Sequence, residues 1–190
     1  MAKIGCECVV CKLMTATFLT KPIYIALGAN LGDPIASFKA AITQLEEFGV
    51  SIKVVSGLWQ SPSWPVGQGH PDYINACAQV EYDGSAREFL SVLHAVEAAH
   101  GRERSVLNAP RQLDLDLIDF RGQLITAKDI KIPHPRMTVR SFVLFPLSQI
   151  APDWSHPLKN EGIQSTISKL PLADIESMKY LGRQNFLRSK

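Results

Sequence analysis

The sequence of 190 residues lacks the features that mark several common classes of protein. It has no apolar run of about eighteen residues, so no segment is predicted to span a bilayer. Its formal net charge is only +2, which does not indicate nucleic acid or a membrane surface as a partner. It has no Walker A or G-x-S-x-G motif, and its five histidines lack the H-E-x-x-H spacing. We therefore expect a cytoplasmic, monomeric globular protein that binds neither nucleic acid nor membrane.

Cysteine is also scarce, with four residues in the chain. Cys6, Cys8 and Cys11 form C-x-C-x-x-C, which indicates either a zinc or iron–sulfur site or a leader with free thiols. Cys77 lies far along the chain in a predicted strand, so a metal site would lack a nearby fourth ligand and we favour the leader. A disulfide framework is not expected in a reducing compartment.

The length suits one domain with tails. We predict a poorly ordered leader over residues 1–20, a single domain over 21–160, and a C-terminal segment over 161–190 that packs on the domain or trails from it.

Hydrophobic periodicity predicts alternating strands and helices within this domain. Asp33 suits the N-cap of the first helix, and Ser85 with Glu88 forms a capping box for the second. The other predicted elements are strands at 21–27, 50–59, 73–82 and 113–117, a hairpin at Gly122 returning to 123–125, and helical segments at 139–150 and 163–170. The order β-α-β-β-α-β predicts an α+β fold, a ferredoxin-like sandwich whose antiparallel sheet has helices on one face and active-site loops on the other.

Two carboxylates lie two residues apart in the fourth predicted strand. Strand alternation places Asp114 and Asp116 on one face and the flanking leucines on the core face. At a separation of about 6–7 Å the two charges repel by about 2–3 kcal/mol for an effective dielectric near 20. A divalent cation reverses that repulsion, and hard oxygen ligands on a rigid strand suit Mg²⁺, which also accepts phosphate oxygens. The alternative is a solvated strand face carrying two charges.

Five arginines lie in the predicted loops on either side of this strand. They are Arg102, Arg104 and Arg111 before it and Arg136 and Arg140 after it. Each alone would fit a solvated basic surface, but beside the aspartate pair they indicate a local polyanion site. Arginine with Mg²⁺ is what phosphoryl transfer requires, because its transition state carries charge on phosphate oxygens.

Six short segments match one enzyme family, and their ordered combination is specific although each alone is weak. They are G-A-N-L-G-D at 28–33, P-D-Y-I-N-A at 71–76, G-R-E-R at 101–104, P-R-Q-L-D-L-D at 110–116, P-H-P-R at 133–136, and R-S-F-V-L with P-L at 140–147. Over about residues 22–157 the sequence resembles the 6-hydroxymethyl-7,8-dihydropterin pyrophosphokinases of folate biosynthesis. The resemblance implies that pyrophosphate passes from ATP to the hydroxymethyl group of the pterin and that AMP is released.

The resemblance also implies roles for single residues. Asp114 and Asp116 would hold two Mg²⁺ ions, and with Arg102 and Arg111 they would form the catalytic set. The residues implied to contact ATP are Glu97, Arg102, Arg111, His134 and Arg140. The residues implied to bind the pterin are Tyr73 and Phe142 by stacking, Asn75 by hydrogen bonds, and Ser61, Pro62 and Trp64 at its border.

Three features depart from the family pattern, one of them Pro135, which follows the histidine where other members have tyrosine. Residues 107–109 read Leu-Asn-Ala where relatives often carry a basic residue, an aromatic and a glycine, and His94 stands where some relatives have glutamine.

Two other functions fit the predicted fold. One is an RNA-binding module, which the low net charge and the acid pair oppose; the other is a different Mg²⁺-dependent phosphotransferase or nucleotide hydrolase, which would release ADP or phosphate in place of AMP.

Overall fold

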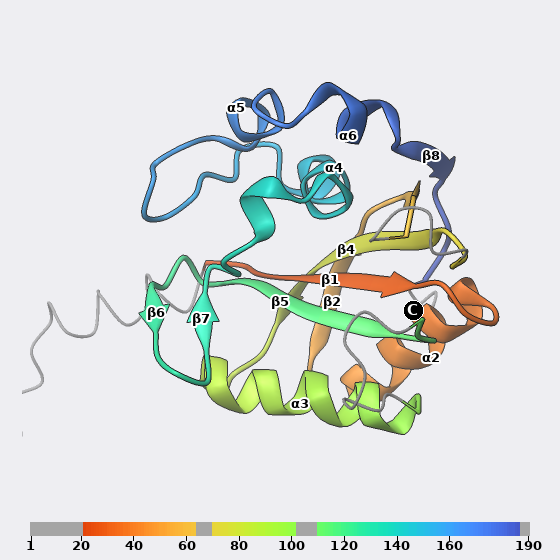
Figure 1. Ribbon diagram of the computed structural model, residues 1–190. Helices are drawn as coiled ribbons and strands as arrows, with labels where there is room; N and C mark the ends of the chain where they lie inside the picture. Colours follow the sequence, from red (N-terminus) through yellow and green to blue (C-terminus); the bar gives the residue numbers. More distant parts are fainter. Residues whose placement is uncertain (1–20, 64–69, 102–109, 187–190) are drawn as a thin grey trace, which may run out of the picture.

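The structure is a computed structural model that describes residues 21–63, 70–101 and 110–186 (Figure 1). Several predictions therefore lie outside the described residues. They are the leader with Cys6, Cys8 and Cys11, the pterin contact Trp64, the arginines Arg102 and Arg104, and the departure at 107–109. Within the described part of the chain, no helix has the length and hydropathy needed to span a membrane.

A six-stranded antiparallel sheet forms the centre of the molecule, in the order β5-β1-β4-β3-β8 with β2 also paired to β4. Its strands are β1 (Ile23–Ala29), β2 (Ser51–Val55), β3 (Leu58–Ser61), β4 (Tyr73–Glu81), β5 (Asp114–Phe120) and β8 (Lys179–Gly182). A separate pair is formed by β6 (Ile125–Thr126) and β7 (Lys131–Ile132). The helices are α2 (Pro34–Glu47), α3 (Ala86–Ala99), α4 (Ser141–Ile150), α5 (Ile163–Ile167) and α6 (Leu172–Glu176), with a 3₁₀ turn η1 at Met137–Val139.

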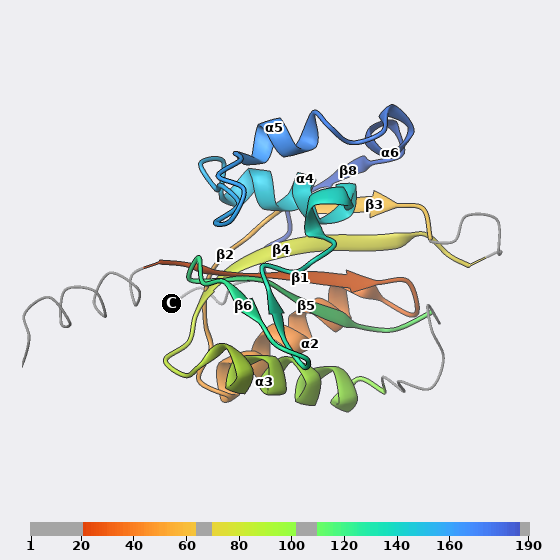
Figure 2. The same ribbon diagram turned by 60° about the vertical axis from the view of Figure 1, so that its left-hand side comes forward.

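Helices α2 and α3 cover one face of the sheet, as Figures 1 and 2 show. The Asp33 side chain accepts hydrogen bonds from the backbone N–H groups of Ile35 and Ala36, and the Ser85–Glu88 capping box is present, so both predicted helix starts are confirmed. Phe38 of α2 and Phe89 of α3 are fully buried and pack in the main core with residues of β1, β4 and β5. The predicted α+β ferredoxin-like architecture is confirmed.

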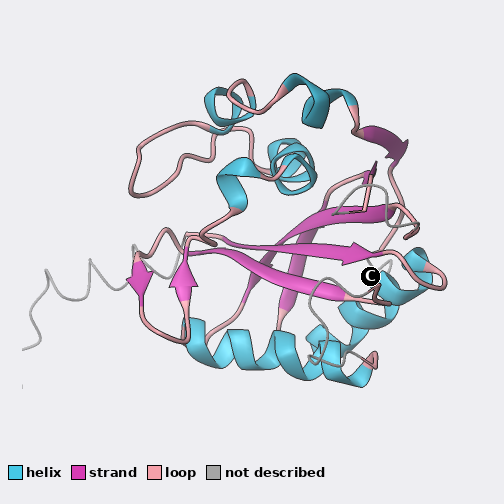
Figure 3. Ribbon diagram, in the orientation of Figure 1, coloured by secondary structure: helices cyan, strands magenta, loops and turns pink. Residues whose placement is uncertain are grey.

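The opposite face carries α4, with α5 and α6 beyond it (Figure 3). Apolar Val143, Leu144 and Leu147 of α4 form a second core with Tyr24 and Cys77 of the sheet. The face that was predicted to be left to loops therefore also carries a helix, and Arg140, which precedes α4, reaches Asp116 on β5.

Two predictions about strands differ from the structure. The strand predicted at 50–59 is divided into β2 and β3 because Ser56 bonds to the backbone of Cys77 through both its N–H and its hydroxyl group, while the Gly57 N–H donates to Gln149. Gly122 does lie in a turn with φ of 65°, but the prediction that the chain then pairs back on β5 is wrong, since β6 pairs with β7. The C-terminal segment adds β8 to the sheet edge beside β3.

Candidate active site

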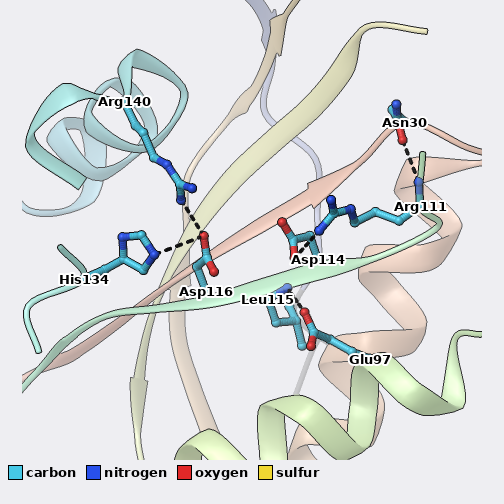
Figure 4. A network of polar contacts seen from close by, with 8 residues as sticks. All are labelled: Asn30, Glu97, Arg111, Asp114, Leu115, Asp116, His134 and Arg140. Carbon is cyan, nitrogen blue, oxygen red and sulfur yellow. Dashed lines mark hydrogen bonds and ion pairs between the residues drawn. The ribbon is translucent and has the colours of Figure 1, made fainter. Parts of the chain in front are cut away.

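The acid pair projects from one side of β5, as the strand alternation predicts (Figure 4). Leu115 and Leu117 are buried in the main core, whereas the side chains of Asp114 and Asp116 are 27% and 30% exposed. Strand β1 lies beside them, with Gly28 opposite Asp114 and Ala26 opposite Asp116. The cross-strand neighbours of both aspartates are therefore small residues, which leaves room beside the carboxylates for a ligand.

Three hydrogen-bond-donating side chains approach this pair, Arg111 from the segment before β5 and His134 and Arg140 from the connection between β7 and α4 (Figure 4). The Arg140 guanidinium donates to Asp116 at 2.7 Å, and His134 Nε2 lies 3.8 Å from the same carboxylate oxygen. The Arg111 guanidinium donates to Asp114 at 3.2 Å. Because these groups are mostly shielded from solvent, their fields act over the site with less screening than those of surface pairs.

His134 is set up as a neutral hydrogen-bond donor. Its Nδ1 accepts a hydrogen bond from the Arg136 backbone N–H at 3.2 Å, so the neutral ring carries its proton on Nε2, which faces the acid pair. Burial lowers the pKa of His134 and outweighs the opposing effect of Asp116. The side chain of Arg136, in contrast, is exposed.

Glu97 lies on the other side of β5 from the two aspartates (Figure 4). It is 1% exposed, and its carboxylate accepts a hydrogen bond from the backbone N–H of Leu115 at 2.8 Å. Strand β5 ends the sheet order, so this bond from α3 fixes the backbone midway between Asp114 and Asp116. A direct contact of Glu97 with a nucleotide stays a prediction.

The residues expected to bind a pterin lie on β4, on or next to β3, and at the start of α4. Tyr73 and Asn75 are on β4, and the Asn75 amide donates to the Ser61 hydroxyl of β3 at 3.0 Å. Pro62 follows at an exposed position. Half-buried Phe142 is the second residue of α4, and the Arg140 guanidinium carbon lies 5.3 Å from its ring centroid.

Gly28 separates these residues from the acid pair, a role that the sequence analysis missed. It pairs with Asn75 on one side and Asp114 on the other. A Cβ atom at this position would lie 3.6 Å from Asn75 Oδ1, 3.7 Å from Tyr73 Cδ1 and 3.8 Å from Asp114 Cβ. At these distances a Cβ atom would make ordinary contacts with all three side chains, so the glycine leaves that small space unfilled between β4 and β5, whose backbones are about 10 Å apart across two strand spacings. A glycine inside a buried strand is the sequence signal for such a close approach.

A groove of about 400 Å³ runs beside the open edge of β5, between α3 and the β6–β7 pair. Leu90 and Ile130 give it apolar walls, Lys128 contributes a positive charge, and Asp116 and His134 also line it. Its volume falls within the range of small-molecule sites. Sequence reasoning missed residues 128–132, because only the packing of the β6–β7 pair places them here.

The family model that matches this chain and the similar named proteins describe the same enzyme family. Residues 24–152 match the family model described as 7,8-dihydro-6-hydroxymethylpterin-pyrophosphokinase. The chain is 36% identical over 147 residues to a Synechocystis protein named 2-amino-4-hydroxy-6-hydroxymethyldihydropteridine pyrophosphokinase, covering 77% of this chain and 74% of that one. It is 34% identical over 158 residues to a Pseudomonas aeruginosa protein of the same name, covering 82% and 96%.

A solved structure shows the same fold in a longer chain. The structure of wild-type Plasmodium falciparum HPPK-DHPS matches with a TM-score of 0.61 at 12% identity, over 78% of this chain and 44% of that chain. The chain described here therefore spans less than half of that protein.

Proposed function

Because the chain belongs to the 7,8-dihydro-6-hydroxymethylpterin-pyrophosphokinase family, we propose that Asp114 and Asp116 hold two Mg²⁺ ions against ATP during pyrophosphate transfer to the pterin. In this reaction the hydroxymethyl oxygen of 6-hydroxymethyl-7,8-dihydropterin bonds to the β-phosphorus of ATP. The bond from that phosphorus to the bridging oxygen of the α-phosphate breaks, AMP leaves, and the hydroxyl proton is released. The observation that carries the assignment of roles is the acid pair with three donors around it.

The donor set fits magnesium. Two carboxylates on one side of a fixed strand supply hard oxygen ligands and leave the remaining positions to water and phosphate, which is how Mg²⁺ is held with nucleotides. Among the described residues no group of three or more histidine, cysteine or acidic side chains is placed to hold a metal, as a dedicated zinc site would require. When bound, the ions neutralise charge on the phosphates and align them.

The hydrogen-bond donors around the two aspartates would bind the phosphate oxygens of ATP. Arg111 and Arg140 are each paired with one aspartate, and exchange of those pairings for phosphate oxygens would keep both guanidinium groups hydrogen-bonded. His134 adds a neutral N–H donor from the same side. The transition state gains from these fixed donors because charge spreads over the transferred phosphoryl oxygens.

The adenosine part of ATP and the pterin would lie on opposite sides of the acid pair. The base and ribose of ATP would lie in the groove beside β5, which reaches Asp116 and His134. The pterin would lie over Gly28, with its polar edge on Asn75 and its ring against Tyr73 and Phe142. This places the hydroxymethyl group toward the acid pair, and alignment of the two substrates supplies much of the rate.

The products that the protein forms from ATP and the pterin test this proposal. Purified protein with ATP, Mg²⁺ and 6-hydroxymethyl-7,8-dihydropterin is expected to form AMP and the pterin diphosphate in equal amounts, measured by chromatography. Omission of the pterin, or chelation of Mg²⁺, is expected to stop AMP formation. Release of ADP or phosphate would favour another phosphotransferase or a hydrolase, and a folded protein that forms no AMP would contradict the proposal.

A further inference from the structure

The motif at 28–33 contains a buried asparagine to which no role has been assigned. Asn30 follows β1, is 5% exposed, and uses both polar atoms of its side chain. Its Oδ1 accepts from the Arg111 backbone N–H at 2.8 Å (Figure 4), and its Nδ2 donates to the Pro71 carbonyl at 3.2 Å. The backbone N–H groups of Asn30 and Leu31 both donate to the Arg111 carbonyl, at 3.1 and 3.3 Å.

The two partners of this side chain belong to different substrate sites. Arg111 precedes β5, and its guanidinium group donates to Asp114 on the triphosphate side. Pro71 precedes β4 by two residues and so positions Tyr73 on the pterin side. The two sites meet again at the Arg111 side chain, whose neighbours are Asp114 on the triphosphate side and Tyr73 on the pterin side.

We propose that Asn30 is a positioning residue that couples the two substrate sites, so that filling one site favours the loop geometry of the other. The proposal rests on the proposed function, since it needs a triphosphate beside Arg111 and a pterin beside Tyr73. Its physical basis is that the buried amide satisfies both atoms only when the backbones at 71 and 111 are in place together. A shift of either one leaves a buried polar group without its partner, which is unfavourable.

Coupling of this kind is measurable and reciprocal. The affinity of the pterin is measured by calorimetry with and without a non-hydrolysable ATP analogue and Mg²⁺. In the wild type the analogue is expected to tighten pterin binding by about 10-fold or more, and the pterin to tighten analogue binding by the same factor. Asn30→Ala is expected to reduce this factor to about twofold or less.

A second variant separates the two bonds. Asn30→Asp keeps the acceptor for the Arg111 N–H but loses the donor to the Pro71 carbonyl, so we expect it to bind the ATP analogue within about threefold of the wild type while losing the coupling. This variant also serves if Asn30→Ala does not fold. The control is Asn185→Ala, an exposed asparagine outside both loops, which is expected to retain the full coupling.

The outcomes distinguish this proposal from the proposed function. A wild type that forms no AMP defeats the function. A wild type that forms AMP but shows no coupling, or folded Asn30 variants that retain it, overturns the role of Asn30 and leaves the function standing. A merely structural role would lower the thermal stability of the variants without changing the coupling factor.

Discussion

Replacement of Asp116 by asparagine is expected to lower kcat by about 10³-fold while the fold is retained. The amide has nearly the same shape but lacks the charge that binds a divalent cation, and loss of about 4 kcal/mol of transition-state stabilisation corresponds to that factor. The side chain lies on the open side of β5 and not in the main core, so the cost to stability is expected to be small. AMP formation at saturating substrates, with circular dichroism of both proteins, measures the effect.

The matched control is Asp153→Asn, an exposed aspartate outside the site. It is expected to turn over at the wild-type rate. Turnover of Asp116→Asn within about threefold of the wild type would mean that the metal is held elsewhere. A loss that excess Mg²⁺ partly reverses would further support a ligand role.

Replacement of Arg140 by alanine is expected to lower kcat/KM for ATP by about 10²- to 10³-fold, the usual effect of removing one fixed donor from a developing charge. Arg140 donates to Asp116 at 2.7 Å, and its side chain is only 16% exposed, so water replaces it poorly. Arg140→Lys keeps the charge but not the planar fork, and an intermediate loss is expected. Initial rates at several ATP concentrations give the values.

Arg136 provides the control for this prediction, because it lies in the same segment but is exposed. Arg136→Ala is expected to change kcat/KM by no more than about threefold, as for other exposed charges. Equal losses in the two alanine variants would indicate a diffuse basic surface in place of a directed donor.

Features fixed by neighbouring residues could be predicted from the sequence. The alternation in β5 and the helix caps at Asp33 and Ser85 depend on contacts within a few residues, and the structure has them as predicted. The order of elements was sufficient for the ferredoxin-like sheet because the split β-α-β arrangement places β4 and β5 on either side of β1, as the structure has them.

The features that sequence reasoning missed depend on contacts between distant segments. Asn30 and Arg111 are 81 residues apart, and Ser56 and Cys77, whose bond divides the predicted second strand, are 21 apart. The groove depends on how the β6–β7 pair packs beside α3, and short strands of two residues leave almost no periodic signal. The roles of Arg102 and Trp64 stay predictions.

The most direct test of the metal site is the number of Mn²⁺ ions, used in place of Mg²⁺, that the protein binds with a non-hydrolysable ATP analogue, counted by electron paramagnetic resonance titration. We expect two ions per wild-type chain. In the variant that combines Asp114→Asn and Asp116→Asn, we expect at most the one ion that the nucleotide carries. Equal numbers of bound ions in the wild type and this variant would contradict the account, because the two carboxylates would then not hold the metal.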